Sequence, residues 1–267
     1  MPFEIQAHRG ARALYPENTI QAFCTAADLG CRVIELDLIA SKDRRILVAH
    51  DPWVPAGDGG EPSRQLCFTL TYEEIARFDC GSPSPEFPGQ QRIRAFRPLL
   101  SEVFRAVESH LCRIGRPGEM LYNLEVKSRA GLEGIAFPPP PEYVALVIGE
   151  IRDSGLADRV RLQSFDHRIV AEARRLMPEL CQGLLVEDEA VLDAFPDCLG
   201  FVPDYVNPHV SLVDPSVVAT LHRHGAKIVV WTVNQPDEMI RMKRLGVDGV
   251  ITDHPETALH LQELTAP

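Results

Sequence analysis

His8-Arg9-Gly10-Ala11-Arg12 directly follows the first apolar run of the chain, and this stretch separates the two folds that the sequence suggests. Along nearly the whole chain, short apolar runs alternate with amphipathic segments of helical period, which is typical of a parallel sheet covered by helices. A doubly wound nucleotide-binding sheet would carry a Gly-x-Gly-x-x-Gly turn after its first strand, and residues 8–12 lack it. The sequence therefore favours a closed barrel over an open sheet.

Eight apolar runs are expected as strands, and eight strand-and-helix units in about 250 residues indicate a (β/α)8 barrel, or TIM barrel. The strands are expected to end near His8, Asp37, Lys127, Phe165, Glu187, Pro208, Val233 and Asp253. The clearest helices are expected at Thr19–Leu29, Glu142–Ser154, Asp166–Met177, Pro215–His224 and Gln235–Leu245. Each of these helices has an apolar stripe, and several begin at a capping-type residue.

Two stretches interrupt this alternation. Residues 39–50 are expected to form a hairpin, in which Ile46–His50 is an extra antiparallel strand beside the second barrel strand. The segment at about 53–97 is rich in Gly, Pro and Ser and contains one helix-like piece, Thr71–Phe78. Long loops of this kind are usually lids or binding elements. We therefore expect a single catalytic barrel domain spanning residues 1–267, with a small insertion that caps one end.

Composition excludes several classes of function. The 267 residues carry 27 Lys and Arg against 38 Asp and Glu, a formal net charge of −11, which argues against a partner such as nucleic acid or an anionic membrane surface. The seven cysteines are scattered and are expected to be reduced thiols. No signal peptide or apolar stretch of about 18 residues is present, so we expect a cytoplasmic protein without membrane insertion. The oligomeric state stays open.

Charged residues interrupt two strands that should be apolar, because both faces of a barrel strand are buried. In the run at 33–39, Glu35 and Asp37 lie two residues apart and therefore point to one face of the strand. In the run at 121–127, the same alternation turns Glu125 to the corresponding face. Three carboxylates from two neighbouring strands are thus expected to converge inside the barrel.

Like charges in a low-dielectric interior resist ionisation unless a cation joins them. Oxygen ligands without cysteine or paired histidine favour one hard divalent cation, Mg²⁺ first with Ca²⁺ and Mn²⁺ as alternatives, over Zn²⁺. A structural network is the competing interpretation, in which Arg9 and Lys127 neutralise the acids.

Two histidines close neighbouring segments: His8-Arg9 ends the first strand and His50-Asp51 ends the hairpin strand. A single histidine is more often structural than catalytic, but two imidazoles near one metal can divide general-base and general-acid duty. Arg9 offers a planar fork and Lys127 a point charge, the combination expected around a phosphate ester.

Trp231 lies on the inward face of its predicted strand. A core aromatic residue and a wall that contacts substrate both place the ring inward, so the pattern leaves both interpretations open.

Short motifs that fit this chemistry occur in order along the chain. They are His8-Arg9-Gly10, Pro16-Glu17-Asn18-Thr19, Glu35-Leu36-Asp37, Lys42-Asp43, His50-Asp51-Pro52, Asn123-Leu124-Glu125-Val126-Lys127, Gln163-Ser164-Phe165, Trp231-Thr232-Val233-Asn234 and the stretch from Gly246 to Pro255. No single motif is decisive. Their joint order, from about residue 5 to residue 257, closely resembles the glycerophosphodiester phosphodiesterase family.

The resemblance implies a (β/α)8 barrel with an insertion after the His-Asp motif, and a divalent-cation-dependent hydrolysis of small glycerophosphodiesters to glycerol 3-phosphate and an alcohol. Carried over by position, it implies Glu35, Asp37 and Glu125 as metal ligands, His8 and His50 as the acid/base pair, Arg9 and Lys127 as phosphate binders and Trp231 on the glycerol side. The expected reaction passes through a cyclic 1,2-phosphate of glycerol. We assign His8 as base and His50 as acid, although the reverse assignment fits the sequence equally.

The chain departs from the family pattern at the hairpin turn, where Asp43-Arg44 stands in place of the usual Asp-Gly. Gly supplies positive φ at such a turn, so either the turn differs or Arg44 is strained. The segment Arg129–Pro141 also differs and is expected to overhang the pocket and alter alcohol selectivity.

Two other functions stay open. One is a phospholipase D-like lyase of the same fold acting on lysophospholipids, although its usual members are secreted and disulfide-bonded. The other is a non-catalytic phosphodiester-binding protein on an inherited barrel, since fold alone does not fix function.

Overall fold

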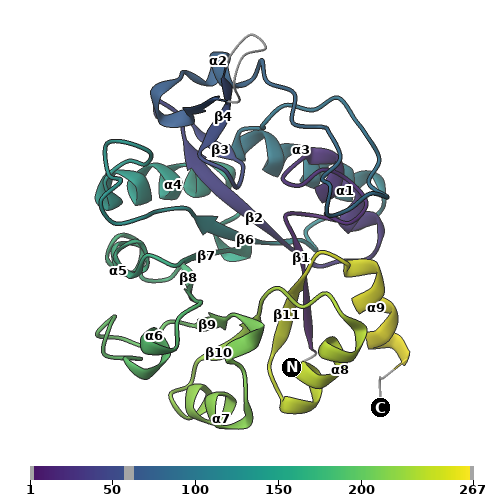
Figure 1. Ribbon diagram of the computed structural model, residues 1–267, viewed down its shortest axis with the longest axis vertical. Coiled ribbons are helices and arrows are strands. Elements are labelled where there is room, and N and C mark those ends of the chain that lie inside the picture. Colours follow the sequence, from purple (N-terminus) through teal and green to yellow (C-terminus); the bar gives the residue numbers. More distant parts are fainter. Residues whose placement is uncertain (1–2, 57–62, 265–267) are drawn as a thin grey trace.

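In the computed structural model, which describes residues 3–56 and 63–264, the protein is a closed barrel of eight parallel strands surrounded by helices (Figure 1). The predicted (β/α)8 barrel is therefore confirmed. Residues 57–62 of the predicted insertion and the ends of the predicted 1–267 domain lie outside the described residues.

Closure of the barrel comes from strand β1, which pairs with β2 on one side and with β11 on the other. The barrel strands are β1 (Glu4–His8), β2 (Val33–Ala40), β6 (Leu121–Val126), β7 (Val160–Ser164), β8 (Cys181–Val186), β9 (Tyr205–Pro208), β10 (Lys227–Val230) and β11 (Gly249–Thr252). Strand β10 ends three residues before the predicted end near Val233, because Trp231 makes only an isolated bridge to His209.

The helices lie around the barrel (Figure 1). They are α1 (Ile20–Asp28), α2 (Tyr72–Ile75), α3 (Leu100–Arg113), α4 (Pro140–Ser154), α5 (His167–Leu176), α6 (Glu189–Asp193), α7 (Pro215–Arg223), α8 (Pro236–Leu245) and α9 (Pro255–Leu264). The predicted helices correspond to α1, α4, α5, α7 and α8, and capping residues such as Thr19 and Asp166 accept hydrogen bonds from the first backbone N–H groups.

Inside the barrel, polar side chains from several strands satisfy one another. Asn123 Nδ2 donates to Gln6 Oε1 at 2.7 Å, and Asn207 Nδ2 donates to Gln163 Oε1 at 2.7 Å. Gln163 in turn donates to Glu35 at 3.4 Å. Buried amides need such partners, and the series from Asn207 through Gln163 leads to Glu35 of the carboxylate cluster described below.

The predicted hairpin is present, with β3 (Ile46–Val48) antiparallel to β2. Arg44 has φ of +62°, so a non-glycine residue does occupy the left-handed conformation in the turn. Its guanidinium forms an ion pair with Glu142 and lies 4.8 Å from the centroid of the Phe68 ring. These contacts offset part of the strain that Gly would avoid.

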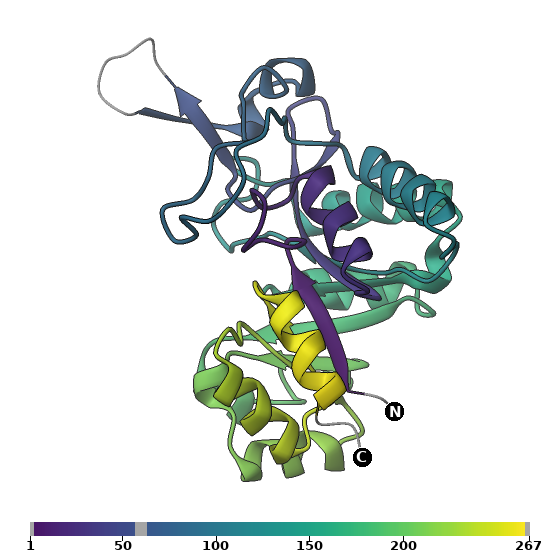
Figure 2. The ribbon, with the colours of Figure 1, turned by 90° about the vertical axis from the view of Figure 1, so that its right-hand side faces the viewer.

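The insertion contains more regular structure than the sequence suggested. Strands β4 (Trp53–Ala56) and β5 (Ser63–Leu66) form an antiparallel pair that projects away from the barrel (Figure 2). The single helical piece expected at 71–78 is the shorter α2, preceded by a 3₁₀ turn at Cys67–Thr69. The pair was missed because Pro55 lies within β4, and proline argues against a strand except at an edge.

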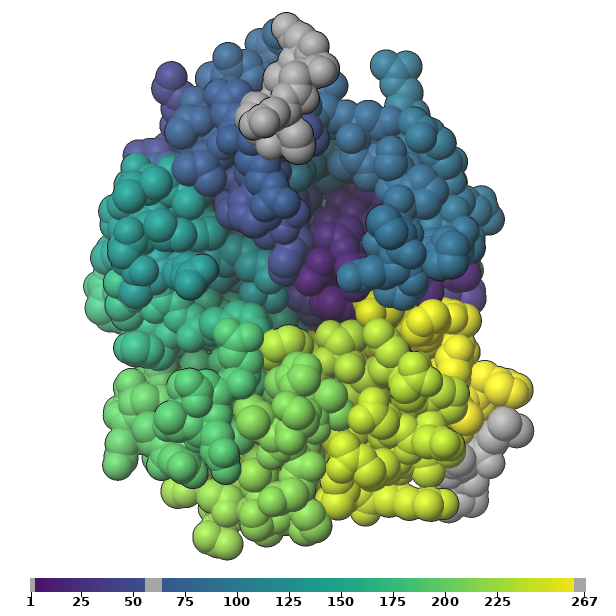
Figure 3. Space-filling model, in the orientation of Figure 1, coloured from purple at the N-terminus to yellow at the C-terminus, as the bar shows by residue number. Residues whose placement is uncertain are grey.

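The rest of the insertion lies against the N-terminal part of the chain, as the blue and purple atoms of the space-filling view show (Figure 3). Gln90 Nε2 donates to the Tyr15 carbonyl at 3.2 Å, and Gln91 N–H donates to the Leu14 carbonyl at 2.9 Å. Backbone and side chain thus fix this segment beside the loop that follows β1.

Within the described ranges, none of the helices combines the length and the apolar character needed to cross a membrane. The seven cysteines are free thiols, of which Cys31 and Cys67 are buried.

Candidate active site

A cavity of about 200 Å³ opens where the barrel strands end, which is the face that carries active sites in this fold. Seven of the eight residues singled out in the sequence line it: His8, Arg9, Glu35, His50, Glu125, Lys127 and Trp231. The eighth, Asp37, does not line the cavity, because it is fully buried next to it.

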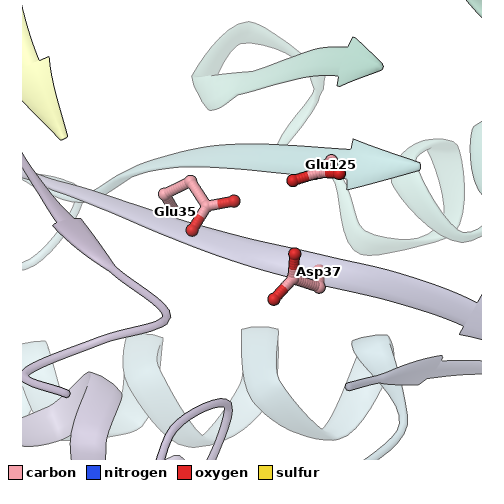
Figure 4. Close-up of side chains that lie close together, drawn as sticks. All are labelled: Glu35, Asp37 and Glu125. Carbon is pink, nitrogen blue, oxygen red and sulfur yellow. The ribbon is translucent and has the colours of Figure 1, made fainter. Parts of the chain in front are cut away.

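Three carboxylates meet beside this cavity (Figure 4). Glu35 and Asp37 come from β2, and Glu125 comes from β6, where it is the direct neighbour of Asp37 across the two strands. One oxygen from each carboxylate lies within 4.8 Å of the others, and all three residues are buried. The alternation of side chains along two adjacent strands is sufficient to bring them together.

Two cationic side chains contact this cluster. Lys127 Nζ lies 2.8 Å from Asp37 Oδ1 and 2.6 Å from Glu125 Oε1, and Arg9 Nε lies 3.1 Å from Asp37 Oδ2. Burial alone would raise the pKa of Asp37, but Lys127 and Arg9 hold that pKa well below its usual range. Asp37 is therefore held as an ionised carboxylate, with Lys127 and Arg9 as its counter-charges.

Glu35 has a different environment. It accepts hydrogen bonds from the Arg9 backbone N–H at 3.1 Å and from Gln163 Nε2 at 3.4 Å. Burial, together with the charges of Asp37 and Glu125, raises the pKa of Glu35 well above its usual value. Three carboxylates face two cationic side chains, so full ionisation of the cluster would leave a surplus of negative charge, which the raised pKa of Glu35 reflects. Its all-oxygen donor set fits a hard divalent cation such as Mg²⁺, which would relieve that surplus.

His8, at the end of β1, is held by a carboxylate. Its Nδ1 lies 2.7 Å from Asp253 Oδ1, and Asn234 Nδ2 donates to the other Asp253 oxygen at 2.7 Å. When Nδ1 carries the proton donated to Asp253, Nε2 is left as a proton acceptor. Burial lowers the pKa of His8, although Asp253 opposes this effect, so the neutral imidazole is favoured.

His50, just beyond β3, forms a second histidine–carboxylate pair. Its Nδ1 lies 2.9 Å from Asp51 Oδ1. The His50 side chain is 38% exposed, whereas that of His8 is 13% exposed. The two imidazoles therefore differ in their access to solvent: His8 is enclosed and His50 lies at the open side of the cavity.

Arg9 is held in an unusual backbone conformation, with φ of +55°. Its Nη1 donates to both oxygens of Glu17 at 2.9 Å, which fixes the guanidinium. The next residue, Gly10, has φ of +85°, and a Cβ there would lie 2.7 Å from the Ala22 carbonyl carbon. Left-handed residues often cluster at functional sites, and here they allow the loop after β1 to turn tightly onto α1.

Trp231 forms part of the cavity wall and also packs against a buried cluster that includes Tyr205, Val229 and Ile251. Its Nε1 donates to the Asn207 carbonyl at 2.7 Å, and its ring makes edge contacts with Phe165 and His209. Phe165 lines the cavity as well.

Several residues that shape the site were not singled out from the sequence. Glu17 orients Arg9, Asn18 donates to Asp37 at 2.8 Å, and Asp253 holds His8. Arg12 contacts both Glu17 and Asp253. Glu17, Asn18 and Asp253 lie within the quoted motifs, so a signal for them was present, whereas nothing in the pattern marked Arg12.

The fold and the site together describe a (β/α)8 barrel whose cavity combines buried carboxylates with the positively charged side chains of Arg9 and Lys127. The chain matches the Glycerophosphoryl diester phosphodiesterase family over residues 8–257 and belongs to it.

Known proteins of this family resemble the chain along its whole length. A glycerophosphodiester phosphodiesterase of Caldanaerobacter subterraneus subsp. tengcongensis is 33% identical over 96% of both chains. A solved structure of a Silicibacter pomeroyi protein named for the same activity has 26% identity and a TM-score of 0.86, and covers 98% of this chain and 93% of its own. An Oleispira antarctica phosphodiesterase in complex with the product sn-glycerol-3-phosphate shares the fold, with a TM-score of 0.78 at 22% identity over 97% of this chain and 96% of its own.

Proposed function

We propose that the chain hydrolyses glycerophosphodiesters to glycerol 3-phosphate and an alcohol. The observation that carries this proposal is the convergence on one cavity of a buried carboxylate cluster and two carboxylate-held histidines. Two positioned imidazoles supply the proton transfers that ester cleavage needs.

We propose Glu35, Asp37 and Glu125 as the ligands of one divalent cation, with Mg²⁺ first and Ca²⁺ or Mn²⁺ as alternatives. Such a cation supplies Lewis acidity and positive charge next to the phosphate oxygens. The support is the all-oxygen donor set and the placement of three carboxylates against only two cationic side chains.

His8 is proposed as the first base. The glycerol 2-hydroxyl attacks phosphorus and gives its proton to His8 Nε2, while Asp253 stabilises the imidazolium that forms. The enclosed position of His8 supports this role, because burial favours the neutral, proton-accepting imidazole.

His50 is proposed as the acid. It gives its proton to the alcohol oxygen as the bond between that oxygen and phosphorus breaks, which leaves a cyclic 1,2-phosphate of glycerol. Water then opens the ring with the roles reversed: His50 accepts the proton of water, and His8 returns its proton to the 2-hydroxyl oxygen. The greater exposure of His50 supports this assignment, because the departing alcohol must reach solvent.

Arg9 and Lys127 are proposed to stabilise the negative charge on the phosphoryl oxygens. Both side chains line the cavity and are fixed by carboxylates, so their charge is already oriented before substrate binds. Trp231 is proposed as the wall on the glycerol side.

The insertion at 53–97 is proposed to cap one side of the cavity. Arg12 Nη2 donates to Glu86 at 3.1 Å and its guanidinium lies 5.0 Å from the centroid of the Phe87 ring, while Nη1 of the same side chain contacts Asp253. The described part of the insertion is thereby connected to the residue that holds His8.

The experiment is product analysis with glycerophosphocholine, glycerophosphoethanolamine and glycerophosphoglycerol, first with chelator and then with Mg²⁺, Mn²⁺ or Ca²⁺ restored. We expect cation-dependent release of glycerol 3-phosphate, with cyclic phosphate only transient. Replacing His8 or His50 by Ala should lower kcat by on the order of 10²–10⁴. Cyclic phosphate as the end product would indicate a lyase, and binding without turnover would indicate a phosphodiester sensor.

A further inference from the structure

A second cavity, of about 260 Å³, adjoins the active-site cavity. The two cavities share His50, Glu125, Lys127 and Phe165 as lining residues. The second cavity therefore meets the active-site cavity at His50, and Trp231 is not among its lining residues.

The wall of the second cavity is largely apolar. It combines Pro52 and Trp53 from the start of the insertion, Phe165 after β7, and Leu132 and Phe137 from the loop between β6 and α4. Such concave, mostly apolar surfaces with few polar groups are typical of small-molecule sites.

Both serine side chains that line this cavity are already engaged. Ser128 Oγ donates to Asp166 at 2.7 Å, and Ser164 Oγ donates to the Val126 carbonyl at 2.8 Å. A polyol would thus find no serine hydroxyl free to pair with its own hydroxyl groups, and buried hydroxyls without partners are costly.

The charged side chains of this cavity offer no surplus of negative charge that would bind a cationic alcohol. Glu125 is paired with Lys127 at 2.6 Å and Asp51 with His50 at 2.9 Å, and Arg129 adds a further positive charge to the lining. A quaternary or primary ammonium group would therefore meet paired carboxylates and additional cations.

The loop that supplies Leu132 and Phe137 is held in place. Gly134 N–H donates to the Phe137 carbonyl at 2.8 Å, and Glu133 forms an ion pair with Arg168 of α5 at 2.6 Å. A wall that is already formed in the free protein lowers the entropic cost of binding.

We propose that this second cavity, the alcohol pocket, binds the leaving alcohol and selects an uncharged alcohol with an apolar body of several carbons. The proposal rests on the proposed function: the acid must lie next to the departing oxygen, and the alcohol pocket begins at His50. It names the substrate class through the alcohol half of the diester.

The test is a series of synthetic glycerophosphodiesters, each carrying ethanol, butan-1-ol, hexan-1-ol, choline or glycerol, assayed with saturating Mg²⁺. The three alkanols are primary alcohols of similar acidity, so differences among them report binding. Each methylene buried in the pocket should raise kcat/KM about fourfold, so we expect about sixteenfold from ethyl to butyl, mainly through KM. The butyl ester should also exceed the choline and glycerol esters.

Leu132→Ala tests the pocket directly, because it removes apolar wall without touching the charged groups. We expect its loss of kcat/KM to be largest for the hexyl ester and smallest for the ethyl ester. The rise of kcat/KM with alkyl chain length should therefore become less steep. Ile135→Ala is the matched control: Ile135 lies on the same loop, is 54% exposed and is not part of the lining. It should leave the series unchanged.

The possible outcomes separate the two proposals. If every ester is hydrolysed but kcat/KM does not rise with alkyl chain length, or if the choline or glycerol ester is preferred, the proposed role of the alcohol pocket is wrong while the hydrolase function stands. Absence of glycerol 3-phosphate from all five esters would overturn the proposed function itself. A steep alkyl series that Leu132→Ala flattens and Ile135→Ala does not would support both.

Discussion

At the residue scale, the site depends on how its two imidazoles are held. Asp253 comes from the end of the last barrel strand, and Asp51 directly follows its histidine in the chain. Both carboxylates contact Nδ1, so in the proposed mechanism Nε2 carries out the proton transfer, as when a carboxylate orients a catalytic histidine. Arg12 adds a positive charge next to Asp253 but not next to Asp51.

Asp253→Asn should lower kcat by on the order of 10²–10⁴, because the amide no longer enforces the Nδ1–H tautomer of His8 or stabilises its imidazolium. The measurement is steady-state turnover of a glycerophosphodiester, together with thermal unfolding to verify the fold. Asp28→Asn is the matched control, because Asp28 pairs with His110 at 2.6 Å on the surface. A turnover of Asp253→Asn equal to that of the control would contradict the role assigned to this pair.

At the element scale, the loop between β1 and α1 carries Arg9 into the cavity only because Gly10 allows the close approach to α1. A side chain at position 10 would meet both a positive φ and the Ala22 backbone, whereas Gly30 combines φ of +101° with open space.

Gly10→Ala should therefore lower the free energy of unfolding by about 2–4 kcal/mol, from left-handed strain plus overpacking. Gly30→Ala should cost about 1 kcal/mol, from strain alone. Urea unfolding of both variants measures the difference. If Gly10→Ala were no more destabilising than Gly30→Ala, the close contact would not constrain this loop.

The start of α5 offers a pH-dependent test at the same scale. Asp166 accepts hydrogen bonds from Arg168 N–H at 3.0 Å and from Ser128 Oγ at 2.7 Å. Burial opposes ionisation, but Arg168 and Ser128 lower the pKa of Asp166 below its ordinary value. A carboxylate with a lowered pKa in the folded state stabilises the protein above its unfolded pKa, and this stabilisation is lost as pH falls through the folded pKa.

Asp166→Asn should accordingly lower the free energy of unfolding by about 1 kcal/mol at pH 7. The difference in the free energy of unfolding between the variant and the wild type should narrow as pH falls below about 4, where the carboxyl group of the unfolded chain is protonated. Urea unfolding at a series of pH values measures it, with Asp153→Asn, exposed on α4, as the control. A gap that stays constant with pH would show that the charge of Asp166 contributes nothing.

At the scale of the whole molecule, the barrel could be predicted because the patterns that mark its strands and helices involve only residues close together in the sequence. Two-residue alternation placed Glu35 and Asp37 on one face, and the parallel pairing of β2 with β6 then brought Glu125 beside Asp37. Helix α3 was not among the expected helices, although Leu100, Val103, Phe104 and Val107 follow a helical period and are buried.

Contacts between distant parts of the chain could not be predicted in this way. His8 and Asp253 are 245 residues apart, and only closure of the barrel makes them neighbours. The same holds for the link from Arg12 to Glu86 and for the second cavity, which needs the insertion, the loop after β6 and the end of β7 at once. Local patterns carry no information on such distances.

The central claim is that the carboxylate cluster at the end of the barrel makes the chain a cation-dependent glycerophosphodiesterase. Its most direct test is the initial rate of glycerol 3-phosphate release by chelator-treated protein as Mg²⁺ is added back, in the wild type and in Glu35→Gln. We predict no turnover with chelator, restored turnover of the wild type on addition of the cation, and a rate for Glu35→Gln at least about 10²-fold lower at every Mg²⁺ concentration. Equal turnover with and without chelator, or a Glu35→Gln variant as fast as the wild type, would contradict the account.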